Sequence, residues 1–567
     1  MPASLRFRAG SAGVGGVGET AAVERIVLVR RGDVVEAHGA SAVHRLPAER
    51  LPGFVREREP AGVRWVWDDT TRWYPALLAE GVRVARCTDL RLAHAVLRRS
   101  PFVDQRLLAA ASTPGWDSLQ PVTETEAALF PLEDPADRLD PPTELERQQA
   151  AVAASPERRR LELLLAAESS GGLVAAEMTH AGLPWRVDVH ERLLTGLLGP
   201  RPPAGHRPAI LERLAGEVRA ALAAPALNPD SPADVLRALQ AAGLPVEDTR
   251  SWTLAQLEHP VVPPLLEYKK LARLLTANGW SWLDSWVREG RFRSWFLPGG
   301  VVTGRWASTG GGALSVPVQV RPAAVADEGW RFVVADVAQL EPRVLAAMSG
   351  DLAMAEAARA ADLYQGMVSA GTVATRAEAK LGILGAMYGG TRGESGRMMP
   401  RLARRYPQAI ALVEEAARAG ERGEVVRTLL GRGSPVPGGA WAERPADLGD
   451  PPEPTGSRQE QDRRRRAWGR FTRNFVVQGT AAEWALCWLA DLRNRLWALG
   501  EGRLEDRPHL VFFLHDEVLV HTPEHLAEQV AEEVRRAAAE AGRLLFGGFP
   551  VDFPLDVAVV RSWAEAG

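Results

Sequence analysis

Acidic side chains near the C-terminus stand between two apolar runs, an arrangement that could hold a metal ion. Residues 510–521 read LVFFLHDEVLVH. Aromatic and β-branched residues on both sides of a short polar break predict two strands joined by a turn. His515, Asp516 and Glu517 would lie at the tip, where rigid carboxylates suit a metal site. The alternative is a solvated turn, which is the commoner meaning of three polar residues between strands.

A second acidic group follows an apolar run earlier in the chain. Residues 331–343 read RFVVADVAQLEPR, so a strand is predicted to end at Asp336 and a helix to begin a few residues later. Asp336 and Asp516 could therefore converge on one cation. The alternative is that Asp336 caps the following helix, a common role for Asp at such a junction.

A third stretch, residues 375–390, reads TRAEAKLGILGAMYGG. Thr375 and Glu378 have the spacing of a capping box, which predicts that a helix begins here. From Arg376, steps of four residues give one face that is cationic, then apolar, then aromatic. The residues of this face after Arg376 are Lys380, Leu384 and Tyr388.

Lys380 is unusual in a chain that uses arginine almost everywhere. The only other lysines among the 68 Lys and Arg residues are Lys269 and Lys270. A retained lysine favours a site that needs a compact, titratable ammonium, although chance retention is the alternative. Gly382 and Gly385 each cost the same helix about 1 kcal/mol relative to alanine. We therefore expect another element to pack closely against this helix.

Taken in chain order, 331–343, 375–390 and 510–521, the three stretches resemble the three polymerase motifs of family A DNA polymerases, the bacterial DNA polymerase I type. The first of these motifs along the chain matches at Asp336, Gln339, Glu341 and Arg343, the second at Arg376, Lys380, Tyr388 and Gly389, and the third is the HDE hairpin. Other segments that resemble the family are residues 266–270 with Lys269 and Lys270, the turn Thr303-Gly304-Arg305, and the stretch with Arg470, Asn474 and Gln478-Gly479-Thr480. The similarity runs from about residue 161 to the C-terminus.

This resemblance implies template-directed DNA synthesis with two Mg²⁺ ions, or Mn²⁺ as an alternative, on primer–template DNA with deoxynucleoside triphosphates. The implied metal ligands are Asp336, Asp516 and Glu517; the implied nucleotide contacts are Arg376, Lys380, Leu384, Tyr388, Gln339, Glu341 and His515; the implied DNA contacts are Arg305, Lys269, Lys270, Arg470, Asn474 and Gln478. Lys380 would also be the catalytic proton donor, and Glu341 the gate against a ribose 2′ hydroxyl. Leu384 stands where the family has an aromatic residue against the incoming sugar.

The implied fold class is α+β and multidomain. It is a right-hand polymerase with an antiparallel palm sheet and helical fingers and thumb, preceded by a small α/β ribonuclease H-like exonuclease-type domain. No 5′ nuclease domain is expected. The expected boundaries are a disordered N-terminus at 1–20, the exonuclease-like domain and a connector at 21–155, a thumb region at 156–290, a first palm part at 291–350, fingers at 351–470 and a second palm part at 471–567. Within these, a connector is expected at 109–155 and a surface loop at 431–458.

The N-terminal region lacks the carboxylates that a proofreading exonuclease needs. No D-x-E follows the first predicted strand, and Trp73 stands where the family has its second-site Asp. We therefore predict a degenerate domain without hydrolytic activity. The alternative is a different constellation built from Asp68, Asp69 and Asp89, although its spacing is wrong for the family.

Composition narrows the function only slightly. The 567 residues carry a net charge of −3, so binding to nucleic acid would depend on local patches such as the arginine-rich stretch 456–476. Cys87 and Cys487 lie far apart and offer neither a zinc framework nor a disulfide pattern. No apolar run has membrane-spanning length. We expect a cytoplasmic, nucleoid-associated monomer, without a prediction of protein partners. The two other functions in view are an inactive DNA-binding scaffold and a 3′–5′ exonuclease.

Overall fold

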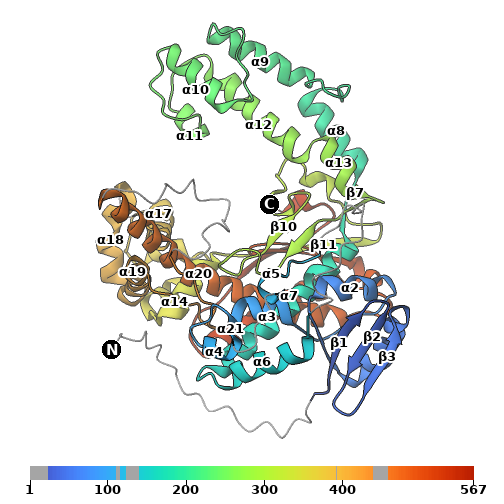
Figure 1. The fold of residues 1–567 in the computed structure, drawn as a ribbon. Helices are drawn as coiled ribbons and strands as arrows, with labels where there is room; N and C mark the ends of the chain where they lie inside the picture. The colour runs from blue at the N-terminus through green and yellow to red at the C-terminus, as the bar shows by residue number, and fades with distance from the viewer. Residues whose placement is uncertain are drawn as a thin grey trace.

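The computed structural model describes residues 23–109, 115–122, 139–359, 361–390, 393–437 and 458–566. Figure 1 shows an N-terminal sheet domain in blue and a helical arm in green that stands away from the rest. A central sheet lies between this arm and the N-terminal domain, and a block of helices lies to one side. The N-terminal segment 1–20, predicted to be disordered, lies outside the described residues.

The N-terminal sheet domain has the mixed sheet expected for a ribonuclease H-like fold. Its strand order is β3-β2-β1-β4-β5; β1, β2 and β3 are antiparallel neighbours, whereas β4 runs parallel to β1 and β5. Trp65, Trp67 and Tyr74 are fully buried beside it. The elements are β1 (Arg25–Arg31), β2 (Val34–His38), β3 (Val43–Pro47), α1 (Leu51–Arg58), β4 (Arg64–Trp67), α2 (Thr70–Ala79), β5 (Cys87–Asp89), α3 (Leu90–Leu97), α4 (Gln105–Ala109) and α5 (Gly115–Ser118).

Part of the expected connector 109–155 is a helix instead. Helix α6 (Pro141–Ala153) packs against α3 and α4, and Ala151 is fully buried. The prediction was wrong here because Asp-Pro-Pro is also a helix start: Asp140 accepts a hydrogen bond from the Thr143 amide at 3.4 Å, and proline is tolerated in the first turn. Residues 123–138 of the expected connector lie outside the described part.

The central sheet is antiparallel throughout, with strand order β12-β13-β11-β14. Helices α7, α20 and α21 pack against it, and their apolar faces join one large hydrophobic core. The elements are α7 (Arg158–Ala181), β11 (Trp330–Val337), α20 (Arg458–Trp497), β12 (His509–Leu514), β13 (Glu517–Pro523), α21 (Ala527–Phe546) and β14 (Leu555–Val560). Short strands nearby are β6 (Leu183–Pro184), β7 (Val287–Arg288), β8 (Arg291–Phe292), β9 (Trp295–Leu297) and β10 (Ala307–Thr309).

The helical arm has its own apolar core, which explains how it can stand away from the sheet. Ser231 caps α10, since its hydroxyl accepts from the Asp234 amide at 3.2 Å. The arm consists of α8 (Val187–Leu198), α9 (Ala209–Ala221), α10 (Pro232–Ala241), α11 (Ser251–Leu254), α12 (Val262–Asn278) and α13 (Trp280–Trp286).

The helix block contains the predicted helix that begins after Thr375. Thr375 accepts from the Glu378 amide at 3.2 Å, and the Glu378 carboxylate accepts from the Ala374 amide at 2.9 Å, one residue earlier than a capping box requires. The predicted close packing is confirmed, because a Cβ on Gly385 would lie 1.6 Å from Oγ of Ser395 on the next helix. The block consists of α14 (Leu340–Ser349), α15 (Leu352–Ala358), α16 (Leu363–Ser369), α17 (Arg376–Tyr388), α18 (Gly393–Arg405) and α19 (Pro407–Glu421).

The prediction of a surface loop at 431–458 was wrong for the first residues of this range. Residues 431–434 are buried and form the second half of a hairpin closed by a bridge between Arg427 and Gly433. Glycine is common in loops, but it also occurs where backbones pack closely together. The glycine content of this segment therefore did not distinguish a loop from a packed hairpin. Residues 438–457 lie outside the described part.

A buried polar network fixes the N-terminal domain to the central core. Arg493 on α20 donates to Glu177 on α7 at 2.6 and 2.8 Å, to the carbonyl of Ala85 at 2.9 Å and to the Tyr74 hydroxyl at 3.2 Å. A buried guanidinium needs these partners, so α20 and the N-terminal domain are packed as one unit. Within the described ranges, no helix is long and apolar enough to cross a membrane.

Candidate active site

Asp336 and Asp516 are brought together by neighbouring strands. β11 and β13 pair so that Asp336 lies opposite Glu517, and the Val337 amide donates to the carbonyl of Asp516 at 3.0 Å. The hairpin prediction is confirmed, with His515 in the turn at φ +58°. The alternative that Asp336 caps a helix is wrong, because α14 begins after Gln339, whose backbone is left-handed at φ +51°.

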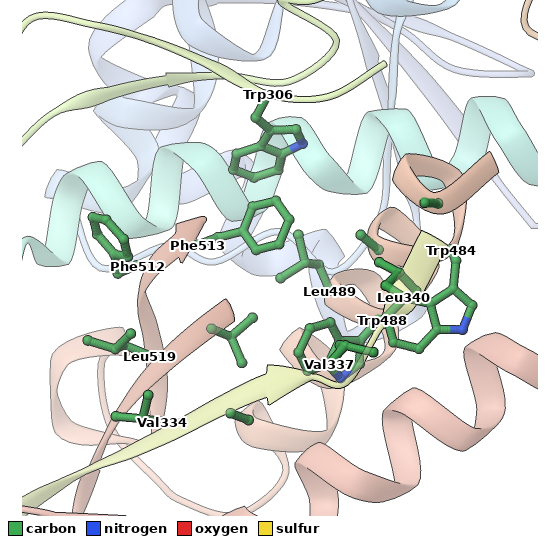
Figure 2. Packing of buried hydrophobic residues seen from close by; sticks show 14 of the residues in the cluster. Trp306, Val334, Val337, Leu340, Trp484, Trp488, Leu489, Phe512, Phe513 and Leu519 are labelled. Carbon is green, nitrogen blue, oxygen red and sulfur yellow. The ribbon is translucent and has the colours of Figure 1, made fainter. Parts of the chain in front are cut away.

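Buried neighbours hold both carboxylates in place. Val337 follows Asp336, Phe513 precedes the turn, and both belong to the large hydrophobic core. The Phe513 ring meets that of Trp306 edge to face, with centroids 5.1 Å apart, and Figure 2 shows this pair beside the strand ends. Because the flanking side chains are locked in a close-packed interior, the carboxylates have little freedom to separate.

The electrostatics of the pair favour a bound cation. Burial, then the charges of Asp516, Glu517 and Asp556, raise the pKa of Asp336 to about 7. Burial also raises the pKa of Asp516 to about 6, with Glu341 and Glu517 adding to the effect. Two carboxylates held close together repel each other, and a bound divalent cation would offset this repulsion.

The number of protein ligands also fits magnesium. Asp336 and Asp516 are the two carboxylates that the paired strand ends bring together. Mg²⁺ is commonly held by one or two carboxylates, with substrate phosphates and water completing its shell. Asp336 and Asp516 therefore fit an ion that arrives with a phosphorylated substrate.

Glu517, a third predicted ligand, is engaged by residues that the sequence did not point to. Trp563 Nε1 donates to its Oε1 at 2.8 Å, and Arg321 lies 3.6 Å from the same oxygen. Asp556, opposite Asp336 on β14, was also missed. The valine-rich sequence of residues 555–560, LDVAVV, could have predicted that strand, whereas no local signal identifies Arg321 or Trp563.

Glu341 connects the acidic pair to α17. It accepts a hydrogen bond from the Tyr388 hydroxyl at 2.7 Å and forms an ion pair with Arg305. A cavity of about 70 Å³ lies between these groups and the hairpin, lined by Arg305, Glu341, His515 and Asp516 among others. The three motifs, which are far apart in the sequence, therefore meet at one place.

The predicted cationic face of α17 is present, but its two cations differ. Arg376 donates to Asp362 at 2.5 Å and lies 5.6 Å from the Tyr364 ring, an ion pair that the sequence did not suggest. Lys380 is exposed and makes neither a hydrogen bond nor an ion pair with any described residue. At 1.5 Å per residue, it lies about 12 Å along the helix from Tyr388. Leu384, between them, is half-buried against the core.

Several predicted contact residues already have protein partners. Gln339 accepts from the Leu363 amide at 3.0 Å, and Lys269 donates to the carbonyl and, at 3.1 Å, to the hydroxyl of Thr249. Lys270 is exposed beside Glu267 at 3.4 Å. On α20, Arg470 is exposed and Gln478 is half-buried, whereas the buried Oδ1 of Asn474 has no hydrogen-bond partner among the described residues.

The carboxylates of the N-terminal domain do come together, but each has a structural partner. Trp73 donates to Asp68 at 2.5 Å, and Arg91 donates to Asp69 at 2.7 Å. Asp89 accepts from the amides of Thr70 and Leu92 at 2.7 and 2.8 Å. Burial and the neighbouring Asp69 raise the pKa of Asp89 to about 6. These contacts support caps and ion pairs as the role of this cluster.

We expect the contribution of Asp336 to the free energy of unfolding of the metal-free protein to fall as pH rises from about 4 to 7. The folded-state pKa of Asp336 lies above its unfolded value of about 3.8, so the fold binds this proton more tightly and loses that stabilisation as the carboxyl ionises. Asp336→Asn should therefore raise stability at pH 8 by about 1 kcal/mol, after discounting for solvent screening. Thermal melts without metal at pH 8 and pH 4 check this, and an equal change at both pH values would contradict it.

The family model and the curated relatives that match this chain all represent DNA polymerases. A family model described as DNA polymerase family A matches residues 210–565. The thermostable DNA polymerase I of Thermus filiformis is 29% identical over 341 residues, which are 54% of this chain and 37% of the relative. DNA polymerase I of Chloroflexus aurantiacus is 26% identical over 370 residues, covering 60% of this chain and 36% of the relative. The matched region thus spans less than two fifths of these curated relatives.

A solved structure shows the same fold over nearly the whole length. The POL domain of Pol1 from M. smegmatis, in complex with DNA primer-template and dNTP, superposes with a TM-score of 0.68 at 20% identity. The match covers 96% of each chain, so the right-hand α+β architecture with its preceding sheet domain is shared. Since the family model covers more than half of the residues, including all three motifs, this chain belongs to DNA polymerase family A.

Proposed function

We propose that this protein is a template-directed DNA polymerase that adds deoxynucleotides to a primer 3′ end. The observation that carries the proposal is the meeting of Asp336 and Asp516 at the ends of the two inner strands of the central sheet, beside Glu341. Glu341 is in turn bonded to the helix that carries Lys380 and Arg376. Phosphoryl transfer requires carboxylates that bind metal ions and positively charged side chains that bind the triphosphate.

The residues of this site would divide the work as follows. Two divalent ions, when bound, lower the pKa of the primer hydroxyl and neutralise charge on the phosphates. Asp336 and Asp516 would hold them, with Glu517 in support. Lys380 and Arg376 would bind the triphosphate, and Lys380 would give a proton to the leaving pyrophosphate. Release of Arg376 from Asp362 would accompany this binding.

The remaining predicted contacts would position the substrates. Tyr388 would lie near the templating base, while Leu384, Gln339 and His515 would contact the nucleotide. The expected contacts with primer–template DNA are Arg305, Lys270, Arg470, Asn474 and Gln478, with Lys269 ordering the arm through Thr249 instead of meeting phosphate directly. The thumb at 156–290, the palm at 291–350 and 471–567, and the fingers at 351–470 are part of the same proposal.

The deciding experiment is primer extension with Mg²⁺, four deoxynucleoside triphosphates and a primer labelled at its 5′ end. Growth of the primer that depends on the template supports the proposal. Shortening of the primer would instead favour the exonuclease, and DNA binding without either change would favour the inactive scaffold. The carboxylates of the N-terminal domain are engaged in caps and ion pairs, which supports the prediction that the primer does not shorten. A cytoplasmic, nucleoid-associated monomer stays a prediction.

We expect Glu341→Ala to increase incorporation of ribonucleotides relative to deoxynucleotides by about tenfold or more, since a steric gate is worth on the order of 1–3 kcal/mol. Glu341 borders the cavity beside Asp516, where the sugar of an incoming nucleotide would lie. The measurement is the ratio of kcat/KM for matched ribo- and deoxynucleoside triphosphates.

The control for Glu341→Ala is Tyr388→Phe. It removes the hydroxyl that donates to Glu341 but keeps the carboxylate. Discrimination against ribonucleotides should therefore survive in this variant, and equal loss in both variants would contradict the gate.

A further inference from the structure

A short hairpin lies between the N-terminal sheet domain and the candidate active site. In this hairpin, residues 426–434, the Thr428 amide donates to the Arg432 carbonyl at 3.0 Å and the Ser434 amide donates to the Val426 carbonyl at 2.8 Å. All of its residues except Arg427 are buried. The hairpin is therefore a packed element, and its contacts with the N-terminal domain can fix the position of the residues on its other side.

The N-terminal domain contacts one side of this hairpin. Ser100 Oγ donates to the Gly431 carbonyl at 2.7 Å. The ring of Phe102 covers Gly431 so closely that a Cβ there would lie 2.3 Å from the ring, and Arg427 lies 4.5 Å from the same ring. Residues 99–102 thus form a surface on which the hairpin is fixed.

The other side of the hairpin contacts the segments that carry predicted DNA contacts. Thr428 donates to Glu483 on α20, and the Leu429 amide donates to Thr480 Oγ1 at 3.0 Å. A Cβ on Gly479 would lie 2.4 Å from Thr428 Cγ2, which shows how closely the hairpin meets α20. Gln478 is the residue immediately before this contact.

Arg432 makes the second contact on that side. Its guanidinium forms a buried ion pair with Glu168 of α7. A Cβ on Gly304 would lie 2.6 Å from Nε of Arg432, so the turn before Arg305 rests directly on this guanidinium. A buried charge with its partner is costly to move, and Arg432 is therefore a fixed support for the turn.

We propose that Ser100 and Phe102 are positioning residues for DNA synthesis. They hold the 426–434 hairpin against Gly304 and Gly479, and this contact fixes Arg305 and Gln478 where they meet primer–template DNA. The N-terminal domain would then serve the polymerase site without any hydrolysis of its own. This inference rests on the proposed function, because Arg305 and Gln478 matter only if the chain binds primer–template.

The test compares Phe102→Leu with Phe54→Leu. Both phenylalanines belong to the N-terminal domain, are half-buried and lie beneath an arginine, but Phe54 is covered by Arg58 of its own helix at 3.7 Å. We expect Phe102→Leu, and more strongly the double variant with Ser100→Ala, to lower kcat/KM for extension about tenfold, since small misplacement of substrate contacts has large effects. Phe54→Leu should leave it unchanged.

Two further readouts separate positioning from general damage to the fold. The effect of Phe102→Leu should largely disappear in an Arg305→Ala/Gln478→Ala background, because a residue that acts through Arg305 and Gln478 cannot add to their loss. Amide hydrogen exchange of residues 300–306 and 426–434 should quicken in Phe102→Leu but not in Phe54→Leu.

Each outcome decides the inference. Additive losses with the Arg305→Ala/Gln478→Ala pair, or unchanged exchange at residues 300–306 in Phe102→Leu, would overturn it. If the parent protein extends no primer, the proposed function fails, and the exchange comparison still decides whether the N-terminal domain fixes the turn before Arg305.

Discussion

Asp336→Asn and Asp516→Asn should each reduce primer extension by about 10³-fold or more, corresponding to at least about 4 kcal/mol of transition-state stabilisation. The amide keeps the shape of each side chain but removes the charge that two carboxylates share at the strand ends. Binding of primer–template DNA should change little, because neither aspartate is among the predicted DNA contacts. Single-turnover extension, beside fluorescence anisotropy with labelled DNA, measures both quantities.

Asp556→Asn is the matched control. Asp556 lies opposite Asp336 on β14 and adds to the same electrostatic repulsion, but it is not at the hairpin turn. We expect its extension rate to stay within a few-fold of the parent. An equally large loss in Asp556→Asn would mean that the total negative charge at these strand ends, and not a specific pair, is required.

Lys380→Ala should lower kcat for nucleotide incorporation by about 10²-fold or more, the usual scale for loss of a general acid. Lys380 is exposed on α17 without a partner among the described residues, so its ammonium is available to a triphosphate. Lys380→Arg should keep the charge and much of the nucleotide affinity but transfer a proton poorly, because the guanidinium pKa lies too high. Pre-steady-state incorporation measured against pH and nucleotide concentration separates these effects.

Lys270→Ala provides the contrast for Lys380. Lys270 is also an exposed lysine, but it lies on α12 beside Glu267. Its loss should weaken DNA binding and reduce the salt dependence of that binding while kcat stays unchanged. A similar fall of kcat in both variants would contradict the proton-donor role of Lys380.

The sequence alone determined the local elements of this protein. The hairpin around His515, the strand ending near Asp336 and the helix beginning after Thr375 all follow from periodicity and capping, which act over a few residues. Their order along the chain pointed to one polymerase family. The predictions were wrong where the same amino-acid composition is compatible with two structures, as in α6 and in the buried start of the 431–458 segment.

Only the tertiary structure decided which partners these side chains have. Glu517 meets Trp563, Arg376 meets Asp362, and Lys269 meets Thr249, in each case across a turn or between separate elements. The contact between the N-terminal domain and the 426–434 hairpin joins residues more than 300 positions apart. Such pairs leave no periodic trace in the sequence, because they depend on how whole elements pack together. The sequence therefore determined which groups could do the chemistry, and packing decided which of them remain free to do it.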